Sequence, residues 1–175
     1  MLEKIMDFTK FFLEEVKINS LDTILDLYKN SIAKMKKDNI DQWDFEIYPN
    51  KKCLKKDILK NEMFAGIIEK TIVSTVVVNK EFSKEYLDCK WNYNGDNFIV
   101  IHRLCVNSDY QNNGIAAKTM SIVETEWKNK GIESIKLDAF SKNPAALRLY
   151  DNLGYKKVGE MDSWKGIFYI FEKKL

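Results

Sequence analysis

The sequence predicts a single α/β domain, and three observations support that prediction. The chain has 175 residues, which is enough for one domain with a hydrophobic core. The run Phe98–Val106 is rich in β-branched residues, as expected of a buried strand. After Gly114, apolar residues recur at helical spacing with charged residues between them. Strand-like and helix-like segments therefore alternate along the chain.

The first half of the chain predicts a strand, two helices and two adjoining strands. We expect the strand at residues 13–17, although Ile5, Phe8, Phe12 and Val16 are also spaced like one face of a helix. A helix capped by Asn19 or Ser20 follows, with Leu21, Ile24, Leu25, Tyr28, Ile32 and Met35 on its buried side. The remaining expected elements are a loop at 39–50, a helix at 52–60, and strands at 64–69 and 71–78.

The second half predicts alternating strands and helices after a polar, aromatic segment at 82–97. The expected elements are a strand at 98–106, a helix at 114–130, a strand at 134–139, a helix at 144–153, and strands at 155–160 and 167–173. Gly131 is suited to end the long helix, because glycine readily adopts the left-handed conformation found there. Pro49 and Pro144 both lie at expected helix starts, where the N–H that proline lacks has no helical partner.

The segment Q-N-N-G-I-A at 111–116 joins an expected strand to an expected helix. The first N–H groups of a helix have no intrahelical partner, and the helix dipole favours negative charge there. Gly114 carries no side chain that would hold a phosphate oxygen away from those amides. The segment therefore predicts an anion site, although the two common glycine-rich nucleotide patterns are absent from the chain.

Two blocks of the C-terminal half resemble the GNAT superfamily of acyl-CoA-dependent N-acyltransferases. The first block reads R-L-C-V at 103–106 and Q-N-N-G-I-A at 111–116, similar to the family's strand end and acyl-CoA pyrophosphate loop. The second block reads I-K-L-D-A at 135–139, N-P-A-A-L-R-L-Y at 143–150 and L-G-Y at 153–155. Both blocks occur at the separation expected of the family, so the resemblance extends to fold and cofactor.

The resemblance implies one N-acetyltransferase domain over residues 1–175. Its sheet would be mixed and mostly antiparallel, flanked by helices, and splayed between the strands near Val106 and Ala139 to admit pantetheine. It implies acetyl-CoA as co-substrate and direct acetyl transfer to an amine, without an acyl-enzyme. Two alternatives stay open: a protein N-terminal or lysyl acetyltransferase, and a non-catalytic acyl-CoA-binding domain.

The resemblance also implies the residues that contact acetyl-CoA, namely Leu104, Val106, Gln111, Asn112, Asn113, Gly114, Ile115, Ala116 and Asn143. The loop departs from the commonest family form, because Asn112 and Asn113 stand where basic residues are frequent, and Ala117 stands where a hydroxyl is frequent. We therefore expect phosphate binding to depend on backbone amides, with Lys118 as the candidate side-chain contact. Asn143 also has a structural explanation as a helix N-cap.

Tyr150 has two interpretations. At helical spacing from Ala146 and Leu153, its ring could serve in packing. The resemblance instead places its hydroxyl beside the thioester sulfur, where a phenol can donate a proton to the leaving thiolate. Tyr150 is therefore the predicted proton donor.

His102 is the single histidine of the chain. Strand alternation predicts that it shares a face with Leu104 and Val106, and that Cys105 lies on the opposite face as a small core residue. The resemblance extends to aralkylamine N-acetyltransferases, which implies a role for His102 in amine deprotonation, since imidazole titrates near neutral pH. A buried core histidine is an equally weighted alternative.

The resemblance implies an acceptor pocket built from the 39–50 loop, the 98–106 strand and the turn at 161–164. Trp43 and Tyr48 are the substrate-binding candidates, and the neighbouring acids Asp44 and Glu46 would suit a cation. The bulk of this loop favours a small, enclosed primary amine as acceptor. Aromatic residues that cap the core, beside solvated acids, are the alternative.

Composition restricts other functions. The 28 basic and 26 acidic residues give a net charge of +2, so we expect no nucleic-acid partner. Three cysteines without metal spacing and one histidine predict no metal site. The N-terminus lacks the apolar core of a signal peptide, and no run approaches membrane-spanning length. We therefore expect a cytoplasmic protein with no membrane partner; its oligomeric state stays open, with a homodimer as one alternative.

Overall fold

The computed structural model describes residues 8–175, which contain one seven-stranded sheet in the order β1-β2-β3-β4-β5-β7-β6. The strands are β1 (Phe12–Glu15), β2 (Met63–Ile68), β3 (Thr71–Asn79), β4 (Phe98–Val106), β5 (Ser134–Phe140), β6 (Lys156–Ser163) and β7 (Gly166–Lys174). The α-helices are α1 (Leu21–Lys37), α2 (Lys51–Leu59), α3 (Ile115–Asn129) and α4 (Pro144–Asn152). β4 and β5 are parallel and all other neighbouring strands antiparallel, which confirms the predicted mixed α/β architecture.

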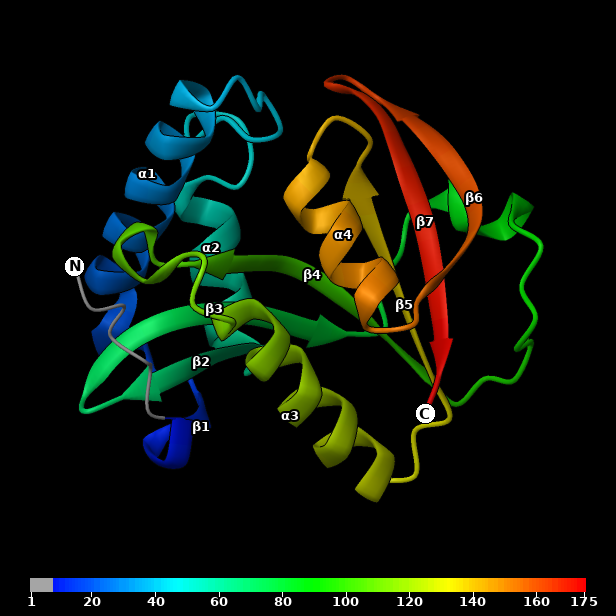
Figure 1. Cartoon of the computed structure of the whole chain (residues 1–175), viewed down its shortest axis with the longest axis horizontal. Helices are drawn as coiled ribbons and strands as arrows, with labels where there is room; N and C mark the ends of the chain where they lie inside the picture. The colour runs from blue at the N-terminus through cyan, green and yellow to red at the C-terminus, as the bar shows by residue number, and fades with distance from the viewer. Residues whose placement is uncertain (1–7) are drawn as a thin grey trace.

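Helices cover both faces of the sheet (Figure 1). On one face, Ile24 and Tyr28 of α1 and Leu54 of α2 are fully buried in a core shared with β2 and β3. On the other face, Met120 and Val123 of α3 lie in a second core that includes residues of β4, β5 and α4. Burying one such side chain contributes roughly 1.5–3 kcal/mol, so the two cores fix the sheet between its helices.

β4 and β5 separate partway along their length. Their pairing runs from Phe98↔Ser134 to Ile101↔Leu137, whereas β4 itself continues to Val106. Figure 1 shows the arrowheads of β4 and β5 pointing apart, with α4 beside the opening. The predicted splay is therefore confirmed, and the backbone groups of β4 beyond Ile101 that face β5 have no partner in that strand.

A β-bulge in β4 overturns the predicted alternation around His102. Thr75 of β3 pairs with Cys105 and Val77 pairs with His102, so two steps along β3 match three along β4. The extra residue lies near Arg103, whose φ of 51° is left-handed. Thr75 and Val77 share a face, so His102 lies on the same face as Cys105 rather than opposite it. Strict alternation cannot show an inserted residue, which is why that prediction was wrong.

The two prolines differ in their relation to the helices. Pro144 is the first residue of α4 and is preceded by the cap Asn143, as predicted. Pro49 instead precedes the cap of α2, which is Asn50, so its predicted place at the helix start was wrong. Gly131 follows the end of α3 with a φ of 85°, in agreement with the predicted helix end.

The first strand is β1, slightly before the predicted range of 13–17. The alternative helical face begins with Ile5, which lies outside the described residues. Phe8–Lys10 forms a 3₁₀ turn, and Phe12 and Val16 lie at or just beyond β1.

Candidate functional site

Two cavities adjoin the splay between β4 and β5. One, of about 410 Å³, extends from the start of α3 to α4, and we call it the splay cavity. The other, of about 440 Å³, lies between the loop before α2, the segment 79–86 and the β6–β7 turn, and we call it the hairpin cavity. Both are lined by Gln42, Trp43, Ile101, His102, Arg103 and Asp138. Molecules bound in the two cavities would therefore meet at this shared wall.

The predicted anion loop lines one end of the splay cavity. Gly114 has a φ of 76° and Asn112 a φ of 63°, so the chain turns sharply into α3. Gln111, Ile115 and Ala116 line the cavity with them. The first N–H groups of α3 have no intrahelical acceptor, so they are available to an anion in the cavity.

Asn113 is the one residue of the predicted loop that does not line the splay cavity. Its Nδ2 donates to the backbone oxygens of Tyr110, at 3.3 Å, and Gln111, at 2.9 Å. The Asn113 side chain therefore stabilises the loop and does not line the cavity, and its predicted contact with the cofactor stays a prediction.

Besides Arg103 of β4, the splay cavity has a basic side chain that comes from α1 and not from the loop. Lys34 lines the cavity, with Asp38 nearby on the same wall, whereas Lys118 does not. Lys34 was missed because no local pattern connects α1 with a loop more than 70 residues later. A positive charge attracts an anion, so Lys34 is a candidate contact for an anion in this cavity.

The end of β4 forms another part of the splay cavity, through Leu104 and Val106. The carbonyl oxygen of Val106 accepts hydrogen bonds from Ser31 Oγ at 2.9 Å and from Gln111 Nε2 at 3.2 Å. This oxygen already has two donors, so a pantetheine arm would use other backbone groups on the open edge of β4.

Asn143 links α4 to the loop before α2. Its Oδ1 accepts from the N–H of Ala146 at 3.1 Å, and its Nδ2 donates to Gln42 Oε1 at 2.8 Å. Lys165 in the β6–β7 turn makes a second link to this loop through Asp41, at 2.6 Å. Both links hold the loop over the junction of the two cavities.

Tyr150 lines the splay cavity and also packs in the core. Its ring lies 5.6 Å from the ring of Tyr155 and 6.1 Å from that of Phe171, measured between centroids. Burial, and then the charge of Asp138, raises the pKa of Tyr150 above its ordinary value. The phenol is therefore protonated at neutral pH and able to donate, so the structural and catalytic interpretations are compatible.

His102 lines both cavities, with one ring nitrogen held in place. Nε2 lies 3.0 Å from Asn79 Oδ1 and 2.9 Å from the carbonyl oxygen of Glu81. A carbonyl oxygen can only accept, so Nε2 carries the proton and Nδ1 carries the lone pair. Burial, and then the charge of Arg103, lowers the pKa of His102 to about 4. The imidazole is therefore neutral at physiological pH and a weaker base than an ordinary histidine.

Asp138 is a site residue that sequence reasoning missed. It lines both cavities, and its Oδ1 accepts a hydrogen bond from the Tyr86 hydroxyl at 2.9 Å. Burial raises the pKa of Asp138 to about 6, although the Tyr86 hydrogen bond and the charge of Arg103 act in the opposite direction. The available signal was an acid within the strand-like run I-K-L-D-A, because buried strands rarely hold an acid without a reason.

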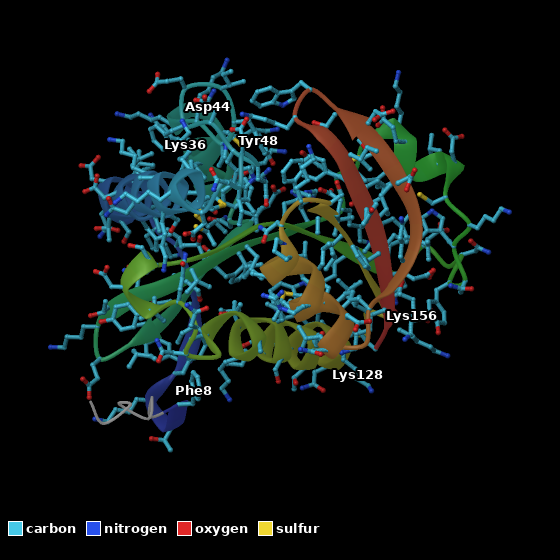
Figure 2. All side chains as sticks on the ribbon, turned by 45° about the horizontal axis from the view of Figure 1, so that its top comes forward. Phe8, Lys36, Asp44, Tyr48, Lys128 and Lys156 are labelled. Atoms are coloured by element: carbon cyan, nitrogen blue, oxygen red, sulfur yellow. The ribbon has the colours of Figure 1, made fainter. Side chains whose placement is uncertain are left out.

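The hairpin cavity has an aromatic wall that includes both predicted candidates, Trp43 and Tyr48. Trp164 of the β6–β7 turn also lines it and is 58% exposed, so an indole ring is accessible at the cavity edge. Asp44 and Glu46, which we expected to attract a cation, do not line either cavity. Figure 2 shows Asp44 beside Lys36, and the Asp44 carboxylate lies 4.0 Å from the Lys36 ammonium.

Arg103 anchors the aromatic loop to α2. Its guanidinium makes a buried ion pair with Asp57 at 2.9 Å and donates to the Tyr48 hydroxyl at 2.6 Å. Its backbone oxygen accepts from the Tyr28 hydroxyl at 2.7 Å, which ties the bulge to α1. Charge-assisted hydrogen bonds of this kind are short and directional, so this network fixes the wall shared by the cavities.

Cys105 is a core residue, as predicted, and its thiol should be inert. It is buried, and burial raises the pKa of its thiol to about 12. We expect a thiol reagent at pH 8 to leave Cys105 unlabelled in the folded protein and to label it after unfolding, because the thiolate is the reactive form. Mass spectrometry of labelled peptides checks this; rapid labelling of Cys105 in the folded protein would contradict it.

The described residues give no sign of a metal centre or a membrane span. In residues 8–175, no group of three or more His, Cys, Asp or Glu side chains could hold a metal ion. No helix of that part of the chain is long and apolar enough to cross a membrane.

Comparison with known proteins places this site in context. The model of the Acetyltransferase (GNAT) family matches residues 27–155. A search of curated protein sequences gives no match. Among solved structures, a GNAT-family acetyltransferase from Streptococcus agalactiae 2603 aligns with a TM-score of 0.82 and 20% identity, covering 94% of this chain and 95% of the other.

Two further structures have the same fold. The PaiA N-acetyltransferase of Thermoplasma acidophilum, solved in complex with coenzyme A, aligns with a TM-score of 0.69 and 19% identity, over 94% of this chain and 99% of that one. The ribosomal-protein-S18-alanine N-acetyltransferase of Escherichia coli aligns with a TM-score of 0.64 and 13% identity, over 94% and 93% of the two chains.

Proposed function

The chain belongs to the acetyltransferase (GNAT) family and is an acetyl-CoA-dependent acetyltransferase, and from this premise we propose that its acceptor is a small primary amine. The observation that supports this acceptor class is the pair of cavities with one shared wall. The splay cavity suits the cofactor, because it joins the anion loop to the open edge of β4. The hairpin cavity, at about 440 Å³, suits a compact acceptor.

The proposed assignment of the cofactor rests on the fit of the splay cavity. The N-terminus of α3 and Lys34 would hold the phosphates, and the open edge of β4 would hold the amide-containing arm. The acetyl group would then lie near Tyr150 and the wall shared with the hairpin cavity. Bound acetyl-CoA supplies the thioester that is to be cleaved.

In the proposed mechanism, the protein positions the amine against the acetyl carbon, donates a proton to the leaving sulfur and accepts a hydrogen bond from the amine. The Tyr150 hydroxyl donates a proton to the departing sulfur, for which its raised pKa keeps it protonated. The neutral His102 offers the lone pair of Nδ1 to the acceptor nitrogen, while Nε2 is held by Asn79 and Glu81. The aromatic wall, with Trp43 and Tyr48, excludes water from the acceptor.

A panel assay tests the proposed acceptor class. Purified protein is incubated with acetyl-CoA and with arylalkyl amines, linear diamines, amino acids or short peptides, and thiol release is followed. We expect the highest kcat/KM with a small primary amine. Turnover confined to peptides would instead support a protein acetyltransferase, and acetyl-CoA binding without any turnover would support a non-catalytic binding domain.

We expect the substitution His102→Gln to lower kcat/KM by the same modest factor at every pH from 6 to 9. The imidazole has a pKa of about 4, so its protonation does not change in this range. General bases contribute roughly 10²–10⁴-fold when their pKa lies near the working pH, so the loss here should be below ~10²-fold. A pH profile of both proteins checks this; a deficit that disappears at alkaline pH would show that His102 titrates near neutrality.

A further inference from the structure

We propose that residues 80–97, which we call the 80–97 segment, form the wall of the hairpin cavity that selects the acceptor by size, and that the buried Glu172 of β7 positions this wall. This inference rests on the proposed amine acetyltransferase function and assigns its selectivity to a part of the chain outside the two blocks that resemble the family. Three features support it: the side chains that the segment presents to the cavity, the contacts that hold its two ends, and the path of contacts between them.

The 80–97 segment covers the face of β5 and β7 opposite α3 and α4. Its Tyr86 packs in a small buried core with Val100 of β4 and Ile170 of β7, whereas the next residue of β7, Phe171, lies in the core of α3 and α4. Figure 1 shows the segment, drawn in green, beside β6 and on the other side of the view from α1. The hairpin cavity therefore lies between this segment and the loop before α2.

The part of the segment that lines the hairpin cavity consists of Glu81, Phe82, Ser83 and Tyr86. The ring of Phe82 is stacked on that of Tyr86, with the centroids 5.7 Å apart and an angle of 18° between the planes. Tyr86 is buried, whereas Phe82 is 42% exposed, so the Phe82 ring is the larger accessible surface of this wall. A ring that is held in place limits the room for the acceptor body, so Phe82 is the expected selector of size.

The first end of the segment is held beside the wall shared by the two cavities. The backbone oxygen of Glu81 accepts from His102 Nε2 at 2.9 Å. The Glu81 carboxylate lies 2.5 Å from the ammonium of Lys60, which directly follows α2. Both side chains of this ion pair are substantially exposed, so the pair itself contributes little to stability.

The far end of the segment is held by Glu172, which is 1% exposed. The N–H of Asn92 lies 2.6 Å from Oε1 and 3.1 Å from Oε2 of this carboxylate. Asn92 Nδ2 donates to Oε1, and the N–H of Tyr93 donates to Oε2, each at 3.3 Å. A buried carboxylate is unfavourable unless it is hydrogen-bonded. The carboxylate and the two backbone N–H groups therefore stabilise each other.

Lys136 places a positive charge next to Glu172 and holds the residue before Asn92. Lys136 pairs with Glu172 across β5 and β7 and is buried. Its ammonium lies 3.9 Å from the ring centroid of Trp91 and 4.0 Å from that of Phe98. A cation between two ring faces attracts both, so Trp91 is held against the sheet.

Trp91 connects this anchor with the cavity wall. Its Nε1 donates to the backbone oxygen of Tyr86 at 2.8 Å, and the centroids of the two rings lie 5.6 Å apart. Tyr86 in turn carries the stacked ring of Phe82. A path of direct contacts therefore leads from Glu172 through Asn92 and Trp91 to the wall. If Glu172 is removed, the wall must be ordered when the acceptor binds, which costs affinity.

The first test changes the wall itself through Phe82→Ala. kcat/KM is measured for linear primary amines of increasing chain length. One methylene in a fitted pocket changes kcat/KM by roughly 10–200-fold, so we expect Phe82→Ala to shift the ratio between the longest and shortest amine at least ~tenfold towards the longest. Tyr93→Ala is the matched control, since Tyr93 is an exposed ring of the same segment that lines neither cavity, and it should keep the wild-type order.

The second test loosens the wall from behind. Glu172→Ala removes every contact with Asn92 and Tyr93, whereas Glu172→Gln keeps one accepting oxygen. We expect Glu172→Ala to raise the KM of the preferred amine about tenfold, because side chains must be ordered on binding, and Glu172→Gln to raise it less. kcat and CoA affinity should stay close to the wild type. Calorimetry of the CoA-bound protein measures amine affinity without turnover.

Glu124→Gln is the control for the loss of a carboxylate from the core. Glu124 of α3 pairs with Lys173 at 2.5 Å, and Lys173 follows Glu172 on the opposite face of β7. Glu124 lines neither cavity. We expect Glu124→Gln to lower Tm and to leave the KM of the amine unchanged. A rise in this KM equal to that in Glu172→Gln would show a general effect of stability and overturn the positioning role.

Hydrogen exchange followed by mass spectrometry gives a readout that needs no substrate. We expect peptides from residues 80–97 to exchange faster in Glu172→Ala than in the wild type, because the N–H groups of Asn92 and Tyr93 lose their acceptor. Peptides from α1 should exchange as in the wild type. Equal exchange of the 80–97 segment in both proteins would overturn the anchoring role of Glu172.

The outcomes separate this proposal from the proposed function. Thiol release with wild-type amine preference and amine affinity in both Phe82→Ala and Glu172→Ala would overturn the role of the wall and leave the acetyltransferase function intact. Amine binding that changes in these variants, without thiol release even by the wild type, would support the wall and overturn the proposed reaction. Absence of both amine binding and thiol release in the wild type would overturn both.

Discussion

Replacing Tyr150 by phenylalanine is expected to lower kcat by roughly 10²–10⁴-fold, the usual contribution of a general acid. The substitution removes the hydroxyl and leaves the ring contacts with Tyr155 and Phe171 in place. Acetyl-CoA affinity and Tm should therefore be close to those of the wild type. Steady-state kinetics at saturating acetyl-CoA, together with calorimetry of CoA binding, measure both effects.

Tyr155→Phe provides a matched control for this substitution. Tyr155 is buried beside Tyr150, but its ring does not line either cavity. Its hydroxyl is buried away from both cavities, so its removal should leave kcat unchanged. If Tyr150→Phe also kept full turnover at saturating cofactor, Tyr150 would be a packing residue and the thiolate would take its proton from another source.

Gly114→Ala is expected to weaken CoA binding about tenfold or more while the fold persists. The φ of Gly114 is 76°, a left-handed conformation that costs an L-residue about 1–2 kcal/mol. The loop can relieve that strain by leaving the conformation that directs the α3 amides into the splay cavity, and about 1.4 kcal/mol corresponds to a tenfold change in affinity. Calorimetry with CoA measures the effect directly.

Gly131→Ala is the control that distinguishes an effect of backbone strain on stability from an effect on the CoA-binding loop. Gly131 has a φ of 85°, and an added Cβ would meet nothing within 4 Å, so the strain is similar to that at Gly114. It lies beyond the far end of α3 and lines neither cavity. We expect both variants to lose some stability, but only Gly114→Ala to lose CoA affinity. Equal CoA affinity in the two variants would remove the 111–116 loop from the binding site.

The cofactor side of the site was largely predictable because its features are local. A strand end, a glycine and a helix start follow one another within the run 103–116, and the geometry of such a junction depends mainly on nearby residues. Asn143 was predictable for the same reason, since a cap acts on the helix that it begins. That the side chain of Asn113 bonds to its own loop was not predictable, because the sequence cannot show which way a loop side chain turns.

The acceptor side was harder to predict, because it is assembled from distant segments. Trp43 and Tyr48 were found through their aromatic character, whereas the acids beside them in sequence, Asp44 and Glu46, lie outside the cavities. The acid that does line both cavities is Asp138, almost 100 residues later.

The amino-acid sequence by itself determined the α/β class, the helix and strand order, the anion loop and the family's two blocks, because periodicity, capping and turn chemistry act over a few residues. The tertiary structure decided which side chains share the reaction space. The bulge at Arg103 placed His102 on the same face of the sheet as Cys105, and the pairing of β5 with β4 and β7 brought Asp138 to the splay. Strand register and charge pairing depend on contacts between remote segments, and these contacts also set the pKa values on which the proposed chemistry depends.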